Sequence, residues 1–592
     1  MRNHTSSHTS SQFMTQRPFI LLASAALLLA LLSACANHAN APEAAATSPQ
    51  APSEAVEELP ERPFSVEALY NLLIAEMAGN RERYDIALGG YLQQAHQTRD
   101  PGVTARAARI ARYLNAREAA LDLALLWVEI SPEDLVARFT AATELAQDGQ
   151  LKAALAHSHY LREHDSTAIY QAIAAKAATS SPAEREELLR EYQALQQKYP
   201  KDTEVLVGLG LLYQQQNQLE PALKATRKAL KINDELMPAI ILETRLLTLL
   251  DRSDEALQRV SALLKRHPDN DRLRLQYARL LAGTDLNQAK PQFSELLSHN
   301  PNDPELIFSL ALVCKELGQW DEAKEHFTVL STFGHHRSSA HYYLGRIAEQ
   351  QQRWNDAIQH YLQVEPGPDL LPATLQTTDI LVRGGQAHTA HKRLDALRSA
   401  FPLQAERFYL LEAEVLGNHL HLTDAKSLLT EGLSQYPNSP VLLYSRAMIS
   451  EKLDRLDEME DDLRLILATD PNNYDALNAL GYTLADRTTR YPEAYQLISR
   501  ALQLSPNNPA ILDSMGWVQY RLGNYQEDLL RFREAMKLYP APEIAAHRGE
   551  VLWVTDQKEE AEKIWSQGLE LNPDDRLIPA VMERLKAAPN AD

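Results

Sequence analysis

Apolar residues in this chain recur every three or four positions, which is the spacing of an amphipathic α-helix. The first stripe of large apolar residues is Leu69, Leu72, Leu73 and Met77. We expect it to pack on a second helix that carries Ala87, Tyr91 and Ala95. Further helices are expected at 106–114, 118–130, 135–148, 151–163, 168–178 and 182–199. The pattern predicts an all-α protein built from helical hairpins.

The pattern repeats most clearly between residues 474 and 572. A glycine, two positions occupied by alanine or an aromatic residue, and a proline recur in a fixed order. These positions are Gly481, Ala494, Ala501 and Pro506, then Gly516, Phe532, Ala535 and Pro540, then Gly549, Ala561, Trp565 and Pro573. The prolines follow one another at roughly 33–35 residues, a period typical of stacked helical hairpins. Each proline is expected to end the second helix of its hairpin.

These spaced positions resemble the tetratricopeptide repeat, which implies a superhelical solenoid. We expect divergent N-terminal helical repeats at 64–200, a tetratricopeptide repeat array of about eleven units at 201–574, and a C-terminal capping helix with a tail at 575–592. Met459 and Asp528 stand where alanine is usual. Each is expected to loosen its hairpin.

The first residues have the features of an export signal. Arg17 precedes an apolar run from Phe19 to Leu32, which is too short to span a bilayer stably. Leu32-Ser33-Ala34-Cys35 resembles a bacterial lipobox, which implies a lipoprotein signal peptide at 1–34 and diacylglycerol with further acylation, such as palmitate, on Cys35. The alternative is an ordinary signal peptide with a chance cysteine. Met1 and Met14 are both possible start residues.

Residues 35–63 are rich in Ala, Pro, Ser, Asn and Glu. Such a segment buries too little apolar surface to offset its ordering entropy, so we expect a flexible tether. Fully extended, it reaches on the order of 90 Å. In lipoproteins of this kind, Ala36 after the cysteine implies delivery to the outer membrane.

Acidic residues outnumber basic ones, 79 against 59, which gives a net charge of −20. This balance argues against nucleic acid as a partner, because affinity for nucleic acid comes largely from cationic contacts to phosphate. It serves solubility, or it favours a basic partner. With only two cysteines, Cys35 and Cys314, we expect no intramolecular disulfide.

No catalytic, cofactor-binding or metal-binding residue is predicted. Ser-centred elbows, zinc-protease motifs and phosphate loops are missing from the sequence, so we do not expect an enzyme. The closest histidines are His335 with His336, His388 with His391, and His419 with His421. No acidic or cysteine ligand accompanies them at a comparable spacing, so we interpret them as solvated or packed.

The stronger functional signal is a set of apolar and aromatic residues on the first helix of each hairpin. That helix lines the inner face of a stacked repeat. By register, the predicted protein-binding groove contains Phe308, Leu312, Tyr342, Tyr444, Met448, Tyr482, Trp517, Tyr520 and Trp553. Tyrosine and tryptophan dominate binding hot spots, although any one of these residues could instead pack between repeats.

As a whole, the chain resembles proteobacterial tetratricopeptide lipoproteins of the outer membrane, and among them those that bind a carboxyl-terminal processing protease. The resemblance covers the lipobox, the tether and the repeats. It implies a lipid-anchored adaptor, facing the periplasm, that binds this serine protease and promotes degradation of its protein substrates, including cell-wall cross-link hydrolases. The alternative is a scaffold for exopolysaccharide export or outer-membrane assembly.

Overall fold

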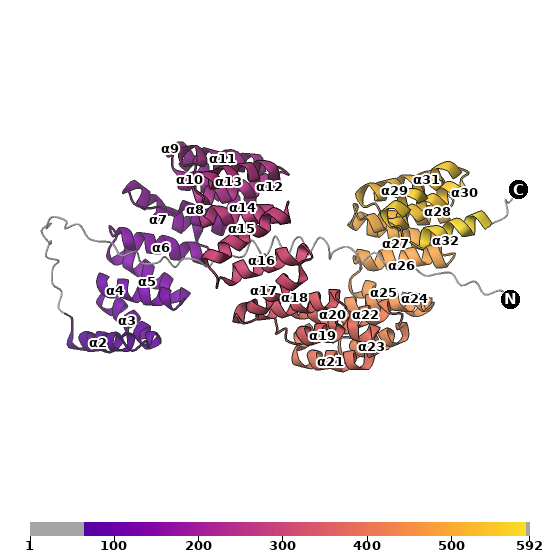
Figure 1. The fold of residues 1–592 in the computed structure, drawn as a ribbon, viewed down its shortest axis with the longest axis horizontal. Helices are drawn as coiled ribbons and strands as arrows, with labels where there is room; N and C mark the ends of the chain where they lie inside the picture. Colours follow the sequence, from indigo (N-terminus) through magenta and orange to yellow (C-terminus); the bar gives the residue numbers. More distant parts are fainter. Residues whose placement is uncertain (1–63, 588–592) are drawn as a thin grey trace. The chain divides into compact units, whose positions relative to one another are not determined.

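The computed structural model describes residues 64–587, apart from the side chains of residues 526–528. Within this range every regular element is a helix, which confirms the all-α prediction (Figure 1). The chain divides into two compact units, one ending at residue 323 and the other beginning at residue 324. The signal peptide at 1–34, Cys35 and the tether at 35–63 lie outside the described residues.

The N-terminal unit begins with the helices that were predicted as divergent repeats. Its elements are α2 (Val66–Gly79), α3 (Tyr84–Thr98), α4 (Pro101–Tyr113), α5 (Arg117–Ile130), α6 (Leu135–Asp148), α7 (Leu151–Glu163), α8 (Tyr170–Lys176), η2 (Ala177–Thr179), α9 (Pro182–Lys198), α10 (Thr203–Gln215), α11 (Leu219–Ile232), α12 (Met237–Leu249), α13 (Ser253–Arg266), α14 (Asp271–Ala282), α15 (Leu286–His299) and α16 (Pro304–Glu316). Helix α17 (Trp320–Leu330) runs across the division between the units.

The C-terminal unit continues the same alternation to the end of the described chain. Its elements are η3 (Gly334–His336), α18 (Arg337–Gln350), α19 (Trp354–Tyr361), α20 (Leu370–Arg383), α21 (Ala387–Ala400), η4 (Pro402–Gln404), α22 (Ala405–Asn418), α23 (Leu422–Gln435), α24 (Pro440–Lys452), α25 (Leu456–Thr469), α26 (Tyr474–Arg487), α27 (Tyr491–Leu504), α28 (Pro509–Arg521), α29 (Tyr525–Leu538), α30 (Pro542–Val554), α31 (Lys558–Leu571) and α32 (Leu577–Ala587). Apart from the last helix, α32, the even-numbered helices are the first helices (A) of their hairpins, and the odd-numbered ones are the second helices (B).

Within each unit, a helix packs mainly on the next helix in the chain and on the next but one. Thus α26 packs on α27 and α28, and α30 packs on α31 and α32. This nearest-neighbour packing is the defining property of a solenoid. The last helix, α32, closes the series against α30 and α31.

Local sequence signals fix the ends of these helices. Several A helices start behind an Asp or Asn whose side chain accepts a backbone N–H, as Asp134 does for α6 and Asn508 for α28. The B helices α27, α29 and α31 each end two residues before the predicted proline. Most of the described turns from A to B contain one residue at positive φ, which Gly149 and Gly523 supply at +86° and +84° in two of them.

Close contacts between A and B helices hold each hairpin together. A Cβ built on Gly516 would stand 2.9 Å from the Phe532 ring, and one built on Gly549 would stand 2.5 Å from Cδ1 and Cε2 of Trp565 and closer still to its Nε1. Glycine therefore lets the ring of helix B lie directly against the backbone of helix A. Met459, at the usual alanine position of α25, is 1% exposed and lies in the main core cluster of the C-terminal unit. The predicted loosening at Met459 stays a prediction, and the side chain of Asp528 lies outside the described residues.

The first hairpin differs from the sequence prediction. Of the four residues expected to pack on α3, Leu72 does pack on the core cluster that contains Ala87, Tyr91 and Ala95. Leu69, Leu73 and Met77 are each more than half exposed. Small residues make the closest approach of the two helices, because a Cβ on Gly90 of α3 would stand 2.9 Å from the Cβ of Ala75. Ala75 is buried, whereas Leu69, Leu73 and Met77 stay largely exposed. Among residues 64–587, no helix combines the length and apolar content required to cross a bilayer.

Candidate protein-binding surface

The structure leaves most of the predicted groove residues partly exposed. Seven are half-buried: Phe308, Tyr342, Tyr444, Met448, Tyr482, Tyr520 and Trp553. The other two, Leu312 and Trp517, are each only 5% exposed. These two side chains are packed against their neighbours, the alternative that the sequence left open, so little of either is exposed in the free chain. The binding role of the nine residues stays a prediction.

The nine residues are divided between the two units. Phe308 and Leu312 lie on α16 in the N-terminal unit, whereas the others lie in the C-terminal unit. Tyr342 packs on its neighbour Tyr343 and on Tyr361, and Trp553 packs on Trp565. The largest group lies on α24, α26 and α28, where four half-buried side chains pack on one core cluster: Tyr444, Met448, Tyr482 and Tyr520. We call these four residues the aromatic surface.

A buried polar pair that the sequence did not reveal lies next to this aromatic surface. Nδ1 of His547 on α30 lies 2.8 Å from Oδ2 of Asp513 on α28, and both residues are at least nine-tenths buried. The Nε2 of His547 lies 3.4 Å from the hydroxyl oxygen of Tyr482 on α26. The imidazole also lies against Trp517, with ring centroids 4.5 Å apart. Three successive A helices therefore meet at His547.

The sequence contained one usable signal for this pair. Asp513 precedes Trp517 by four residues, so both fall on the same face of α28. His547, however, lies a full repeat away along the chain. Its contact with Asp513 depends on how α28 and α30 pack, which the repeat period alone does not specify.

The ionisable groups where α26, α28 and α30 meet shift one another's pKa values. Burial disfavours the charged form of His547, but the charge and hydrogen bond of Asp513, with Glu543 and Asp486, outweigh it and raise the pKa of His547 to about 9. Burial is also the largest influence on Glu543, and with Asp513, Asp575 and Asp486 it raises the pKa of Glu543 to about 8. His547 is thus positively charged at neutral pH and holds Asp513 as a salt bridge.

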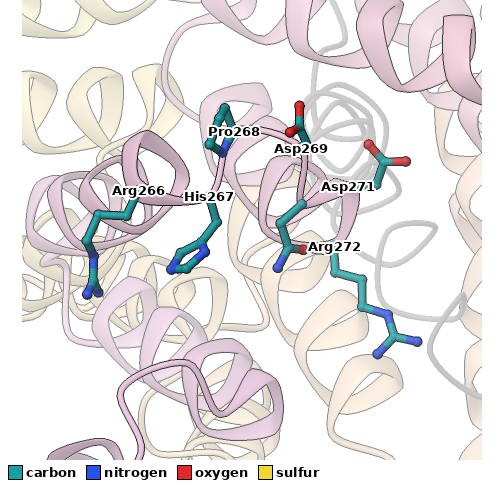
Figure 2. A pocket seen from close by; sticks show the side chains of 7 residues that line it. Arg266, His267, Pro268, Asp269, Asp271 and Arg272 are labelled. Carbon is teal, nitrogen blue, oxygen red and sulfur yellow. The ribbon is translucent and has the colours of Figure 1, made fainter.

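A shallow hollow of about 590 Å³ lies elsewhere, at the turn between α13 and α14. Figure 2 shows its charged side chains pointing away from one another, with Arg266 and Arg272 on opposite sides of the turn. Several of them already have partners: Arg266 pairs with Asp234 at 2.8 Å, and His267 pairs with Glu235 at 2.8 Å. Binding pockets are mostly apolar with a few convergent polar groups, which this turn does not provide.

Two stretches of the chain match the family model of the tetratricopeptide repeat, residues 203–235 and residues 315–370. The TPR repeat-containing protein PA4667 of Pseudomonas aeruginosa is 43% identical over 488 residues, which cover 82% of this chain and 82% of that protein. This chain belongs to the tetratricopeptide-repeat family. Proteins of the family bind other proteins, and their fold suits a scaffold or an adaptor.

Other similarities of this tetratricopeptide-repeat protein are more distant. Cellulose synthase operon protein C of Pseudomonas fluorescens is 22% identical over 363 residues, covering 58% of this chain and 26% of that protein. A thermophilic TPR protein of Thermus thermophilus is 20% identical, with a TM-score of 0.28, and covers 31% of this chain and 98% of its own. Yeast Tom70 is 13% identical, with a TM-score of 0.32, and covers 88% of this chain and 99% of its own.

The reactive side chains of this tetratricopeptide-repeat protein are engaged in packing. Cys314 is fully buried, and burial raises the pKa of its thiol to about 11, which disfavours the nucleophilic thiolate. His391 lies 2.9 Å from Glu412 and His419 lies 2.8 Å from Asp379. Within residues 64–587, no three His, Cys, Asp or Glu side chains gather in a way that could hold a metal ion. The surfaces described here are suited to binding.

Proposed function

We propose that this tetratricopeptide-repeat protein is a lipid-anchored adaptor of the outer membrane, facing the periplasm. It binds a carboxyl-terminal processing serine protease and promotes degradation of the protease's substrates, such as cell-wall cross-link hydrolases. The lipobox at Cys35 supports the membrane anchor. Holding protease and substrate on one anchored scaffold raises their effective concentration, which accelerates cleavage without any new chemistry.

The observation that carries the adaptor role is the aromatic surface. Its four side chains come from three successive A helices, pack on one core and remain half-buried. Tyrosine and methionine are enriched at protein interfaces, and tyrosine buries much area at a modest cost in conformational entropy. A rigid row of such side chains is a suitable binding surface for a polypeptide.

A capture experiment tests this role. The tagged full-length protein is purified from a detergent extract, and the bound protease is identified by mass spectrometry and by its cleavage of a cross-link hydrolase. Replacing Tyr444 and Met448 by Ala should reduce capture at least about tenfold, since hot-spot truncations cost at least ~2 kcal/mol. The matched control is Leu465→Ala on α25, an apolar residue that is 41% exposed outside the aromatic surface. Equal capture by both variants, with unchanged circular dichroism, would contradict the role of this surface.

A second candidate is a scaffold for exopolysaccharide export or outer-membrane assembly. The similarity to cellulose synthase operon protein C favours it, although the matched region is only 26% of that protein. The same capture experiment separates the two. A co-purifying protease supports the adaptor, and a co-purifying polysaccharide-export porin supports the scaffold. Peptide hydrolysis by the purified chain alone would contradict both.

A further inference from the structure

Three acidic side chains surround the point where α26, α28 and α30 meet. Asp486 lies one turn after Tyr482 on α26, Asp513 one turn before Trp517 on α28, and Glu543 one turn before His547 on α30. Residues one turn apart share a helix face. Because the ring of His547 lies against the rings of both Tyr482 and Trp517, the three carboxyl groups flank the same spot.

These three acids have too few positive partners. Among residues 64–587, Asp513 forms an ion pair with His547 alone, and no Lys or Arg pairs with the carboxyl group of Asp486 or Glu543. Arg521 donates a hydrogen bond to the backbone carbonyl of Asp486 and to the Tyr491 hydroxyl. When all three acids are ionised, the cluster carries three negative charges against the one positive charge of His547. The pKa of Glu543, raised to about 8, means that this acid is largely protonated at neutral pH in the free protein and that a bound cation would favour its ionised form.

Two nearby acidic residues, in contrast, are each paired with an arginine. Glu451 on α24 pairs with Arg487 at 3.2 Å, and Glu550 on α30 pairs with Arg584 of α32 at 2.5 Å. Each of these acids has a guanidinium supplied by a neighbouring helix. The cluster of Asp486, Asp513 and Glu543 has the same kind of acids without that cation.

Two buried polar atoms at the cluster also have no hydrogen-bond partner among the described residues. One is Oδ1 of Asp513, an acceptor, and the other is Nε1 of Trp517, a donor. Both side chains are 5% exposed. Buried polar groups are nearly always hydrogen-bonded, so each unpaired atom in a native structure calls for an explanation. A polypeptide provides both missing groups, a cationic donor from a side chain and a carbonyl acceptor from its backbone.

The neighbouring rings favour a cationic side chain over a metal ion. Lys and Arg are attracted to the faces of Trp and Tyr, and Trp517, Tyr482 and Tyr520 lie beside the acids. Tyr482 and Glu543 are half-buried, so the rim of the cluster is open to solvent, and side-chain rotation on binding is common at interfaces. The net charge of −20 would attract a basic segment from a distance.

We propose that the meeting point of α26, α28 and α30 binds a lysine or arginine side chain from an extended segment of a protein partner. This inference rests on the proposed role of the chain as a protein-binding adaptor, and it specifies the chemistry of the bound segment. The cationic group lies between Glu543 and Asp486 and donates to Oδ1 of Asp513. The backbone of the segment accepts from Nε1 of Trp517.

Fluorescein-labelled peptides test the proposal directly with the full-length protein in detergent. The peptides share one Gly/Ala background and carry a central Lys, Arg, norleucine or Glu. Fluorescence anisotropy should show the Lys and Arg peptides binding at least about tenfold more tightly than the norleucine and Glu peptides, as expected for charge-assisted hydrogen bonds. Glu543→Gln and Asp486→Asn should each remove most of this preference.

The matched control is Glu550→Gln on the same helix, because Arg584 already neutralises Glu550. It should leave the affinity for the Lys peptide within about twofold of the unaltered protein. Equal affinity for the Lys and norleucine peptides, or an unchanged preference in Glu543→Gln, overturns the proposal. Capture of the protease from extract is scored separately, so its failure counts against the adaptor role, whereas loss of the charge preference counts against this site alone.

Discussion

Gly549 provides a sharp test of how the hairpins are packed. Gly549 lies within helix α30, and a Cβ on it would stand 2.5 Å from Cδ1 and Cε2 of Trp565. Real Cβ atoms essentially never come so close to another heavy atom, so the ring or the helix must move. Trp565 is fully buried between α30 and its neighbours, which leaves the ring no solvent to move into. We therefore expect Gly549→Ala to destabilise the last hairpin.

The size of the effect follows from two opposing contributions. Alanine in a helix interior is favoured over glycine by about 1 kcal/mol. Overpacking a well-filled core costs ~1–3 kcal/mol, and the short approach to a buried ring places this site near the upper end. The net loss is about 2 kcal/mol, or roughly a thirtyfold increase in local opening.

Gly89 in α3 is the matched control, because a Cβ there meets no atom within 4 Å. Gly89→Ala retains only the favourable contribution and should stabilise its hairpin by about 1 kcal/mol. Hydrogen exchange measured by mass spectrometry reports each hairpin separately, which matters because a solenoid need not unfold in one step. If Gly549→Ala slowed exchange in α30 and α31 as Gly89→Ala does in α3, the packing argument would be wrong.

Three further predictions concern the anchor, the thiol and the buried histidine. Replacing Cys35 by Ser should move the protein from the membrane to the soluble fraction, and continued sedimentation with membranes would contradict lipidation. Iodoacetamide should label Cys314 only after unfolding, because the thiol is fully buried with its pKa raised to about 11; labelling of the native chain would contradict this. Since the folded pKa of His547 is raised from 6.5 to about 9 by its acidic neighbours, the pair with Asp513 stabilises the last repeats fully below pH 6.5 and is lost as pH rises through 9. The pKa of Glu543, raised from 4.5 to about 8 mainly by burial, also makes the folded state less stable as pH rises. Hydrogen exchange in α30, corrected for its intrinsic pH dependence, should therefore accelerate as pH rises from 6.5 through 9. The acceleration should be smaller in His547→Gln.

Much of the fold was predictable because its signals are local. The expected helix at 135–148 coincides with α6, whose start and end depend on the neighbouring Asp134 and Gly149. The prolines that follow α27, α29 and α31 also act within a few residues of the helix ends. Such signals require no knowledge of distant contacts.

The site depended on contacts between repeats and was less predictable. Trp517 has the right register for the inner face, yet His547 and Tyr520 cover it. The outer face of α2 was misjudged for a related reason. The helices α2 and α3 approach most closely at Ala75 and Gly90, which are small residues. Periodicity alone does not show whether a helix makes its contact through small or through large side chains.

The contact between glycine and ring has an evolutionary consequence. Gly345 with Tyr361, Gly516 with Phe532 and Gly549 with Trp565 are each pairs sixteen residues apart, and both members belong to the same hairpin. A duplicated hairpin therefore carries both the glycine and the ring that packs on it, and deletion of a hairpin removes both residues together. The number of repeats can change during descent while the internal fit of every remaining hairpin is preserved.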